Sequence, residues 1–91
     1  MMEAWLRRRV RFLRSMGYDE LEILFDLMKS RYGPWTAWDE EMWLEALRAR
    51  GLLDKPELAV RFVLACEEER AWTPEERRFI RALRAILLEE K

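Results

Sequence analysis

The chain has 91 residues, of which 51% are hydrophobic and 38% are charged, and its formal net charge is -1 at pH 7. These values predict one folded domain over residues 1–91, and they exclude a disordered chain and a protein that spans a membrane. The small net charge also argues against a protein that binds polyanions over its whole surface.

The first predicted helix covers residues 3–16, where apolar side chains recur at helical spacing and arginines occupy the other side. Gly17 follows, at the position where many helices end in a residue with positive φ. Asp19 and Glu22 then have the three-residue spacing of a capping box. We therefore expect a second helix to begin directly after Asp19.

The segment between the second and third helices contains both a stop signal and a start signal. Gly33 and Pro34 should end the second helix, because proline cannot continue a helix, and we expect Gly33 to adopt the left-handed conformation. The third helix begins near either Thr36 or Asp39, since both residue types are good helix caps. Gly51 should end this helix with a second positive φ.

The fourth predicted helix, at about residues 55–71, contains the most apolar stretch of the chain. Eight of the nine residues in 58–66 are apolar. A helix that is apolar on nearly all sides must be covered on most of them, so we predict that this helix lies at the centre of the fold. Asp54 and Glu57 have the spacing of a capping box at its start.

The fifth helix is predicted from its first turn. Thr73, Pro74 and Glu76 supply an N-cap, a first-turn proline and a capping-box glutamate in the correct order. No segment shows the alternation that is typical of a strand. The predicted fold is therefore all-α, a compact orthogonal bundle of five short helices with the fourth at its centre.

The residue types restrict the chemistry that this chain can perform. It has no histidine and one cysteine, Cys66. There is consequently no imidazole base, no Cys–His pair and no set of thiolates for zinc. Cys66 lies within the apolar run, so we interpret it as a buried structural thiol. We expect no catalytic residues, no metal site and no cofactor, and hence a protein that is not an enzyme.

Tryptophan provides the first indication of a binding surface. The chain has five tryptophans, three of which fall within residues 35–43. Tryptophan is rarely buried completely and is enriched at protein interfaces. Trp35 and Trp38 are therefore candidate partner-binding residues. The alternative is that they close the corners of a small core.

Arginines provide the second indication, because two groups of them recur at spacings of four and three residues along a helix. If the first and fifth helices are neighbours, the two groups would form one basic face that binds phosphates or an acidic protein surface. Alternatively, these arginines pair with the glutamates of the chain itself. The groups are Arg7, Arg11 and Arg14 in the first helix and Arg77, Arg81 and Arg84 in the fifth.

One local resemblance adds to this reading. Residues 46–54 read Ala-Leu-Arg-Ala-Arg-Gly-Leu-Leu-Asp, and the pairs Leu58-Ala59 and Phe62-Val63 follow. Over residues 46–65 this pattern resembles one three-helix repeat of the RecX-type recombinase regulators. The resemblance implies binding to a recombinase filament without catalysis, and it assigns no individual functional residue.

Composition also bears on origin and compartment. The chain has fourteen arginines against three lysines and no asparagine or glutamine, which is typical of a thermophile. A single cysteine within an apolar run predicts a reducing, cytoplasmic compartment. Arginines interrupt the N-terminal segment, so it does not have the pattern of a secretory signal.

These observations favour a small, non-enzymatic binding or regulatory protein that acts by binding another protein. The alternative is a nucleic-acid-binding protein that uses the arginine-rich faces of the first and fifth helices. A homodimer is compatible with either surface, and no association with a membrane is expected.

Overall fold

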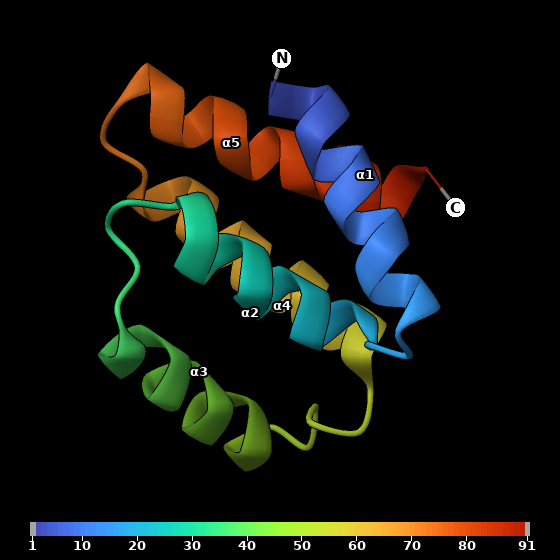
Figure 1. Ribbon diagram of the computed structural model, residues 1–91. Helices are drawn as coiled ribbons and strands as arrows, with labels where there is room; N and C mark the ends of the chain where they lie inside the picture. The colour runs from blue at the N-terminus through green and yellow to red at the C-terminus, as the bar shows by residue number, and fades with distance from the viewer. Residues whose placement is uncertain (1, 91) are drawn as a thin grey trace.

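Five α-helices follow one another along residues 2–90, the part of the chain that the computed structural model describes (Figure 1). No strand occurs within these residues, and none of their helices is long and apolar enough to cross a membrane. The predicted all-α bundle is therefore confirmed. The elements are α1 (Met2–Ser15), α2 (Glu20–Arg31), α3 (Ala37–Ala49), α4 (Pro56–Arg70) and α5 (Pro74–Arg84), which continues into one π-helical turn (Ala85–Glu89).

Two helices begin with the capping boxes that the sequence predicts. The carboxylate of Asp19 accepts the backbone N–H of Glu22, and the carboxylate of Glu22 accepts the backbone N–H of Asp19, both at 2.8 Å. Thr73 and Glu76 make the equivalent reciprocal pair at the start of α5. Each box satisfies backbone donors that the first turn of a helix leaves unpaired.

The loop between α2 and α3 shows which of two residues caps α3, and it lacks the left-handed turn expected at Gly33. Thr36 is the N-cap of α3, and the Asp39 carboxylate accepts its backbone N–H at 2.7 Å. The expected left-handed ending at Gly33 is wrong, because α2 already ends with Tyr32 in an extended conformation and the φ of Gly33 is not positive. Gly33 precedes Pro34, and a residue before proline is restricted towards extended conformations.

The start of α4 also differs from the prediction. The expected capping box of Asp54 with Glu57 is absent, because the N-cap is Lys55 and the first helical residue is Pro56. The fixed φ of proline suits the first position of a helix. That preference places the cap one residue later than the spacing of the two acidic residues implies.

The core is built on the contact between α2 and α4. Six of the twelve residues of α2 are buried, and the helix packs on α4 along its length, with α5 on α4 and α1 on α2 (Figure 1). α3 lies on the other side of this pair and is attached through large side chains. Trp43 of α3 meets Phe62 of α4 edge to face, with 5.8 Å between ring centroids.

The buried surface of α4 is narrower than the sequence predicts. Ala59, Val60, Val63 and Leu64 are fully buried, but Leu58 is 51% exposed. Phe62 and Cys66 are only half-buried, so Cys66 packs against the core as predicted but part of its side chain reaches the surface. The helix is central through its contacts with α2 and α5, yet a chain of this size lacks enough elements to surround one helix on every side.

α4 has one leucine that is fully buried, Leu64, and one that is exposed, Leu58. Replacing each of them tests whether only one side of the helix is packed. Leu64→Ala should lower the free energy of unfolding by about 2–5 kcal/mol, because it leaves a cavity in the core. Leu58→Ala should change the free energy by no more than about 0.5 kcal/mol, as expected at an exposed site. Urea unfolding of both variants measures the difference, and equal losses would contradict the described orientation of α4.

Gly17 and Gly51 end α1 and α3 with φ values of 91° and 69°, as the sequence predicts. A side chain at positive φ meets its own backbone, so Gly51→Ala should lower the free energy of unfolding by about 1–2 kcal/mol. Gly33→Ala is the control, because Gly33 lacks a positive φ and an added Cβ would have open space. This control should be neutral or slightly stabilising in the same chemical melt, and a stabilised Gly51→Ala would contradict the described turn.

Candidate functional site

The two predicted arginine groups are largely paired with carboxylates of the chain itself. In the first helix, both oxygens of Glu90 accept hydrogen bonds from Arg7, with Nε–Oε1 at 2.8 Å. Both oxygens of Glu20 accept from Arg14 at 3.0 Å. The hydrogen bonds from Arg7 hold the pKa of Glu90 below its usual range. Arg7 and Arg14 therefore pair with glutamates of the same chain, which is the alternative to a free basic face.

In α5, Arg81 and Arg84 share one carboxylate. Both form ion pairs with Glu68 of α4, the Arg81 Nε lying 3.1 Å from Oε2. The hydrogen bond from Arg81 is the main cause that lowers the pKa of Glu68. These pairs attach α5 to the polar end of α4, where three glutamates would otherwise oppose the helix dipole.

A groove of about 600 Å³ nevertheless brings arginines of α1 and α5 together. Arg7 and Glu3 of α1 line this groove together with Arg77, Arg78 and Arg81 of α5, so that four guanidinium groups stand against one carboxylate. Arg11, Arg14 and Arg84 do not line this groove, and Arg84 instead pairs with Glu68 of α4. Within residues 2–90, neither Arg77 nor Arg78 forms an ion pair. The groove therefore retains unneutralised positive charge.

The remaining arginine of the first helix lies next to this groove. Arg11 lines a smaller hollow beside Ile86, together with Arg7 and Arg14. The side chain of Arg11 makes no ion pair within the described residues, but Glu90 lies in the same hollow. This part of the arginine surface is therefore partly neutralised.

The tryptophans divide between the core and the surface. Trp35 is only 7% exposed and packs on Phe25, with 5.6 Å between ring centroids, so its assignment to a partner surface is wrong. Trp38 is 77% exposed and remains a candidate. Trp72 is 89% exposed and was not selected from the sequence. Trp72 precedes the N-cap of a helix, and this position in the sequence does not indicate whether another helix covers the side chain.

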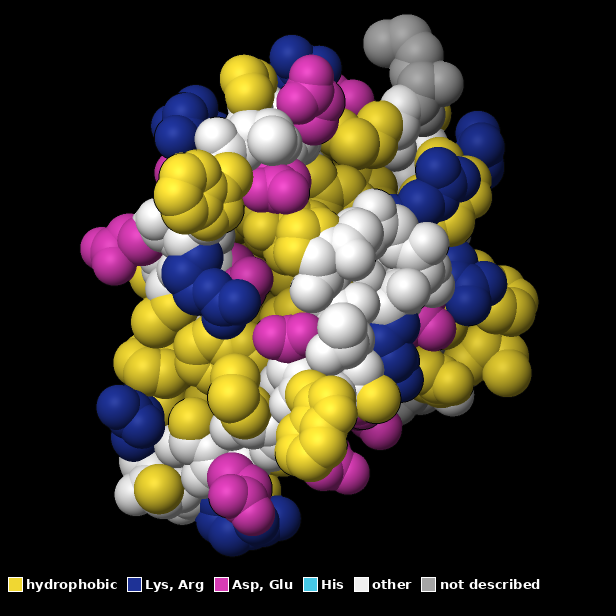
Figure 2. Space-filling view, turned by 90° about the vertical axis from the view of Figure 1, so that its left-hand side faces the viewer, with side chains coloured by type: hydrophobic (Ala, Val, Ile, Leu, Met, Phe, Trp, Pro, Cys, Tyr) yellow, Lys and Arg dark blue, Asp and Glu magenta, His cyan; other side chains and the backbone are white. Residues whose placement is uncertain are grey.

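The two exposed tryptophans lie at the same end of the bundle. Trp38 is in the first turn of α3, and Trp72 is in the turn between α4 and α5. An ion pair between Arg70 and Asp39, at 3.9 Å, joins these two regions. Figure 2 shows this end, where apolar side chains alternate with charges of both signs. We call Trp38, Trp72 and the groove between Pro34 and Trp72 the tryptophan surface.

The groove of the tryptophan surface is acidic in balance. Its volume is about 600 Å³, and it runs beside Pro34 and Trp72. Its charged lining residues are Glu67, Glu69, Glu76, Arg70 and Arg77. Three carboxylates here stand against two guanidinium groups, whereas arginines predominate in the groove between α1 and α5.

Glu67 is a buried carboxylate at the floor of this surface. It is 2% exposed and accepts a hydrogen bond from Arg70 at 2.9 Å. Burial raises the pKa of Glu67, and the charge of Arg70 and the nearby indole N–H of Trp43 offset part of that rise. The indole N–H approaches the carboxylate without the geometry of a formed hydrogen bond. Glu67 is thus a charged group that folding partly desolvates.

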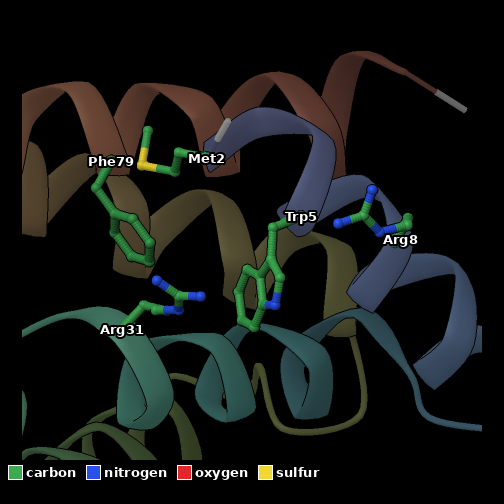
Figure 3. A pocket seen from close by; sticks show the side chains of 5 residues that line it. All are labelled: Met2, Trp5, Arg8, Arg31 and Phe79. Carbon is green, nitrogen blue, oxygen red and sulfur yellow. The ribbon is translucent and has the colours of Figure 1, made fainter.

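A further hollow lies between α1, α2 and α5 (Figure 3). Its lining residues are Met2, Trp5, Arg8, Arg31 and Phe79, and none of them is acidic. The guanidinium of Arg31 lies over the Trp5 ring, 4.1 Å from its centroid. Neither arginine is a candidate from the sequence, because Arg8 and Arg31 belong to different helices and only the folded arrangement places them around one hollow.

Comparison with protein-family models, curated proteins and solved structures gives no match to this chain. The described residues contain no group of three or more cysteine, aspartate or glutamate side chains that could hold a metal ion. The surfaces described above are therefore the basis on which a function can be proposed.

The raised pKa of Glu67 predicts a specific dependence of stability on pH. The pKa of Glu67 is about 4.5 in the unfolded chain and higher in the folded protein. As the pH rises through this interval, the unfolded chain loses the proton first, and the contribution of Glu67 to the free energy of unfolding therefore falls. Glu67→Gln removes this contribution. Relative to the wild type, the variant should gain stability between pH 4 and pH 7 in urea melts.

The matched control for this experiment is Glu69→Gln, which removes an exposed carboxylate two residues along the same helix. Relative to the wild type, Glu69→Gln should not show the gain in stability between pH 4 and pH 7 that is expected for Glu67→Gln. A difference between wild type and Glu67→Gln that is constant with pH would show that folding does not perturb Glu67.

Proposed function

We propose that the protein is a small, non-enzymatic binding protein, and that its partner is another protein docked on the tryptophan surface. The supporting observation is the exposure of Trp38 and Trp72 at one end of the bundle, at 77% and 89%. Tryptophan is the side chain most enriched among residues that dominate binding energy. Two such rings, each able to bury roughly 150–250 Å², provide anchors for a partner.

The charges around these rings favour a protein over a nucleic acid at this end. Glu67, Glu69 and Glu76 line the groove beside Trp72. Carboxylates repel a phosphate backbone, whereas they complement lysine and arginine side chains on a protein. The proposed partner therefore presents basic groups around apolar pockets that accept the indole rings.

A second candidate function is supported by the groove between α1 and α5. Arg77 and Arg78 lack ion pairs within residues 2–90, and Arg7 and Arg81 lie in the same groove. Arginines that bind phosphates release condensed counterions from the nucleic acid, so the affinity would fall steeply with salt. Nucleic-acid binding at this groove is the alternative to the protein-binding function.

The resemblance of residues 46–65 to a RecX-type repeat suggests a recombinase filament as the first purified partner to test. Thermophilic origin and a cytoplasmic location remain predictions from the composition. A second copy of the chain is also a protein partner of the proposed kind, and sedimentation of the pure protein tests for it directly.

The proposed function is tested with the double variant Trp38→Ala/Trp72→Ala. Both side chains are exposed, so the free energy of unfolding should change by no more than about 1 kcal/mol. Partners captured by the wild type from a lysate of the producing cells are purified, and their affinity is measured by titration. The double variant should weaken binding by at least about 30-fold, which corresponds to the loss of one hot-spot residue worth about 2 kcal/mol.

The control for this test is Phe12→Ala/Met16→Ala, which removes two exposed apolar side chains in the last turn of α1 and directly after it. It should leave the affinity unchanged. Equal affinity of the wild type and the tryptophan variant for every purified partner would contradict the proposal. Steep salt dependence with DNA or RNA, abolished by Arg77→Glu/Arg78→Glu and unaffected by the tryptophan variant, would establish the second candidate instead.

A further inference from the structure

Three helices contribute side chains to the hollow shown in Figure 3. Met2, Trp5 and Arg8 come from α1, Arg31 is the last residue of α2, and Phe79 comes from α5. The hollow has a volume of about 440 Å³. This size is within the range of pockets that bind small organic molecules, roughly 300–1,000 Å³.

The positive charge of this hollow is not neutralised within the described residues. Arg7 and Arg9, on either side of Arg8 in the sequence, bind Glu90 and Asp26. Arg8 itself forms no ion pair, and Arg31 contacts only the Trp5 ring. The two grooves described above contain glutamates, whereas no carboxylate lines this hollow. An anion entering it would meet two guanidinium groups and no opposing charge.

The stacking of Arg31 on Trp5 prepares one guanidinium for an anion. The Cζ atom lies 4.1 Å from the ring centroid, which is a favourable cation–π distance. Within residues 2–90 no hydrogen bond occupies the N–H groups of Arg31, so they can bind the two oxygens of a carboxylate or phosphate. The ring thus limits the motion of Arg31 without occupying its hydrogen-bond donors.

The other walls of the hollow are apolar, and one of them is fixed by the core. Phe79 is only 6% exposed and stacks on Tyr32, with 5.7 Å between ring centroids. Met2 and Trp5 are half-buried and pack against the core. An inorganic ion would contact the arginines alone and leave these walls unused, and a neutral aromatic molecule would leave the arginines unused.

We propose that this hollow binds a small organic oxyanion, namely a carboxylate or phosphate monoester attached to a planar apolar body. The oxyanion accepts hydrogen bonds from Arg31, and the apolar body lies against Trp5, Phe79 and Met2. Arg8, on the other side of the Trp5 ring (Figure 3), adds positive charge to the hollow. The site shares no residue with the tryptophan surface, so it stands whether or not the proposed protein partner exists.

The proposal is tested by NMR titration of the ¹⁵N-labelled protein, which follows the indole N–H resonance of Trp5 with that of Trp38 as an internal reference. The probes are benzoate, phenyl phosphate, the neutral isostere benzamide, and inorganic phosphate. Benzoate or phenyl phosphate should shift the Trp5 resonance saturably and leave Trp38 unchanged. The stronger of the two identifies whether the site prefers a carboxylate or a phosphate.

Three variants assign the binding to the arginines. Arg31→Gln should weaken binding of the preferred probe by about tenfold or more, because it removes charge-assisted hydrogen bonds. Arg8→Gln should weaken binding by less than Arg31→Gln, because it removes only a nearby positive charge. Arg48→Gln, at an exposed arginine of α3 that forms no ion pair within residues 2–90, should leave binding unchanged. All three sites are exposed, so each variant should fold.

Several results would overturn the proposal. One is the absence of a saturable Trp5 shift with either anionic probe. Another is that benzamide binds as tightly as benzoate, or inorganic phosphate as tightly as phenyl phosphate, since the site would then lack either its anionic or its apolar component. Equal weakening by Arg48→Gln and Arg31→Gln would show that binding reflects general charge and not this hollow.

Discussion

The contact between α2 and α4 is the constraint on which the rest of the molecule depends. Leu24 and Leu27 of α2 and Val60 and Leu64 of α4 are completely buried, and the other helices attach to this pair. Because only five helices are present, they cover α4 over part of its circumference. Apolar residues outside that arc, such as Leu58, reach the surface. The proposed binding surfaces include apolar side chains that the packed helices leave exposed.

The charged side chains also fall into two groups, those that form ion pairs within the bundle and those that do not. Arg7, Arg14 and Arg84 each bind a carboxylate on another helix or turn, and these pairs connect the elements of the bundle. Exposed pairs of this kind add little to stability individually, but they remove positive charge from the surface. Among the arginines that form no ion pair within residues 2–90, Arg77 and Arg78 line the groove between α1 and α5, and Arg8 and Arg31 line the hollow around Trp5. The distribution of unpaired arginines is thus more informative about binding than their total number.

The aromatic side chains connect the two proposed sites through the core. Tyr32 lines the groove beside Trp72, Phe79 lines the hollow beside Trp5, and the two rings stack on each other. A change in the position of either ring would therefore be felt on both sides of the pair, since packed interiors transmit displacement. Both sites use aromatic rings as rigid walls and charged groups at the rim.

The sequence by itself determined the features whose cause is local. The caps at Asp19 and Thr73 and the positive φ of Gly17 and Gly51 depend on hydrogen bonds and sterics within a few residues, so their patterns predict them correctly. The tertiary structure alone decided which of two similar residues is buried. Trp35 and Trp38 are three residues apart, as are Glu67 and Arg70, yet Trp35 and Glu67 enter the core while Trp38 remains in solvent. Burial depends on which distant helix covers a position, and spacing along one helix does not contain that information. For the same reason Arg8 and Arg31 could not be recognised as neighbours before the fold placed α1 beside the end of α2.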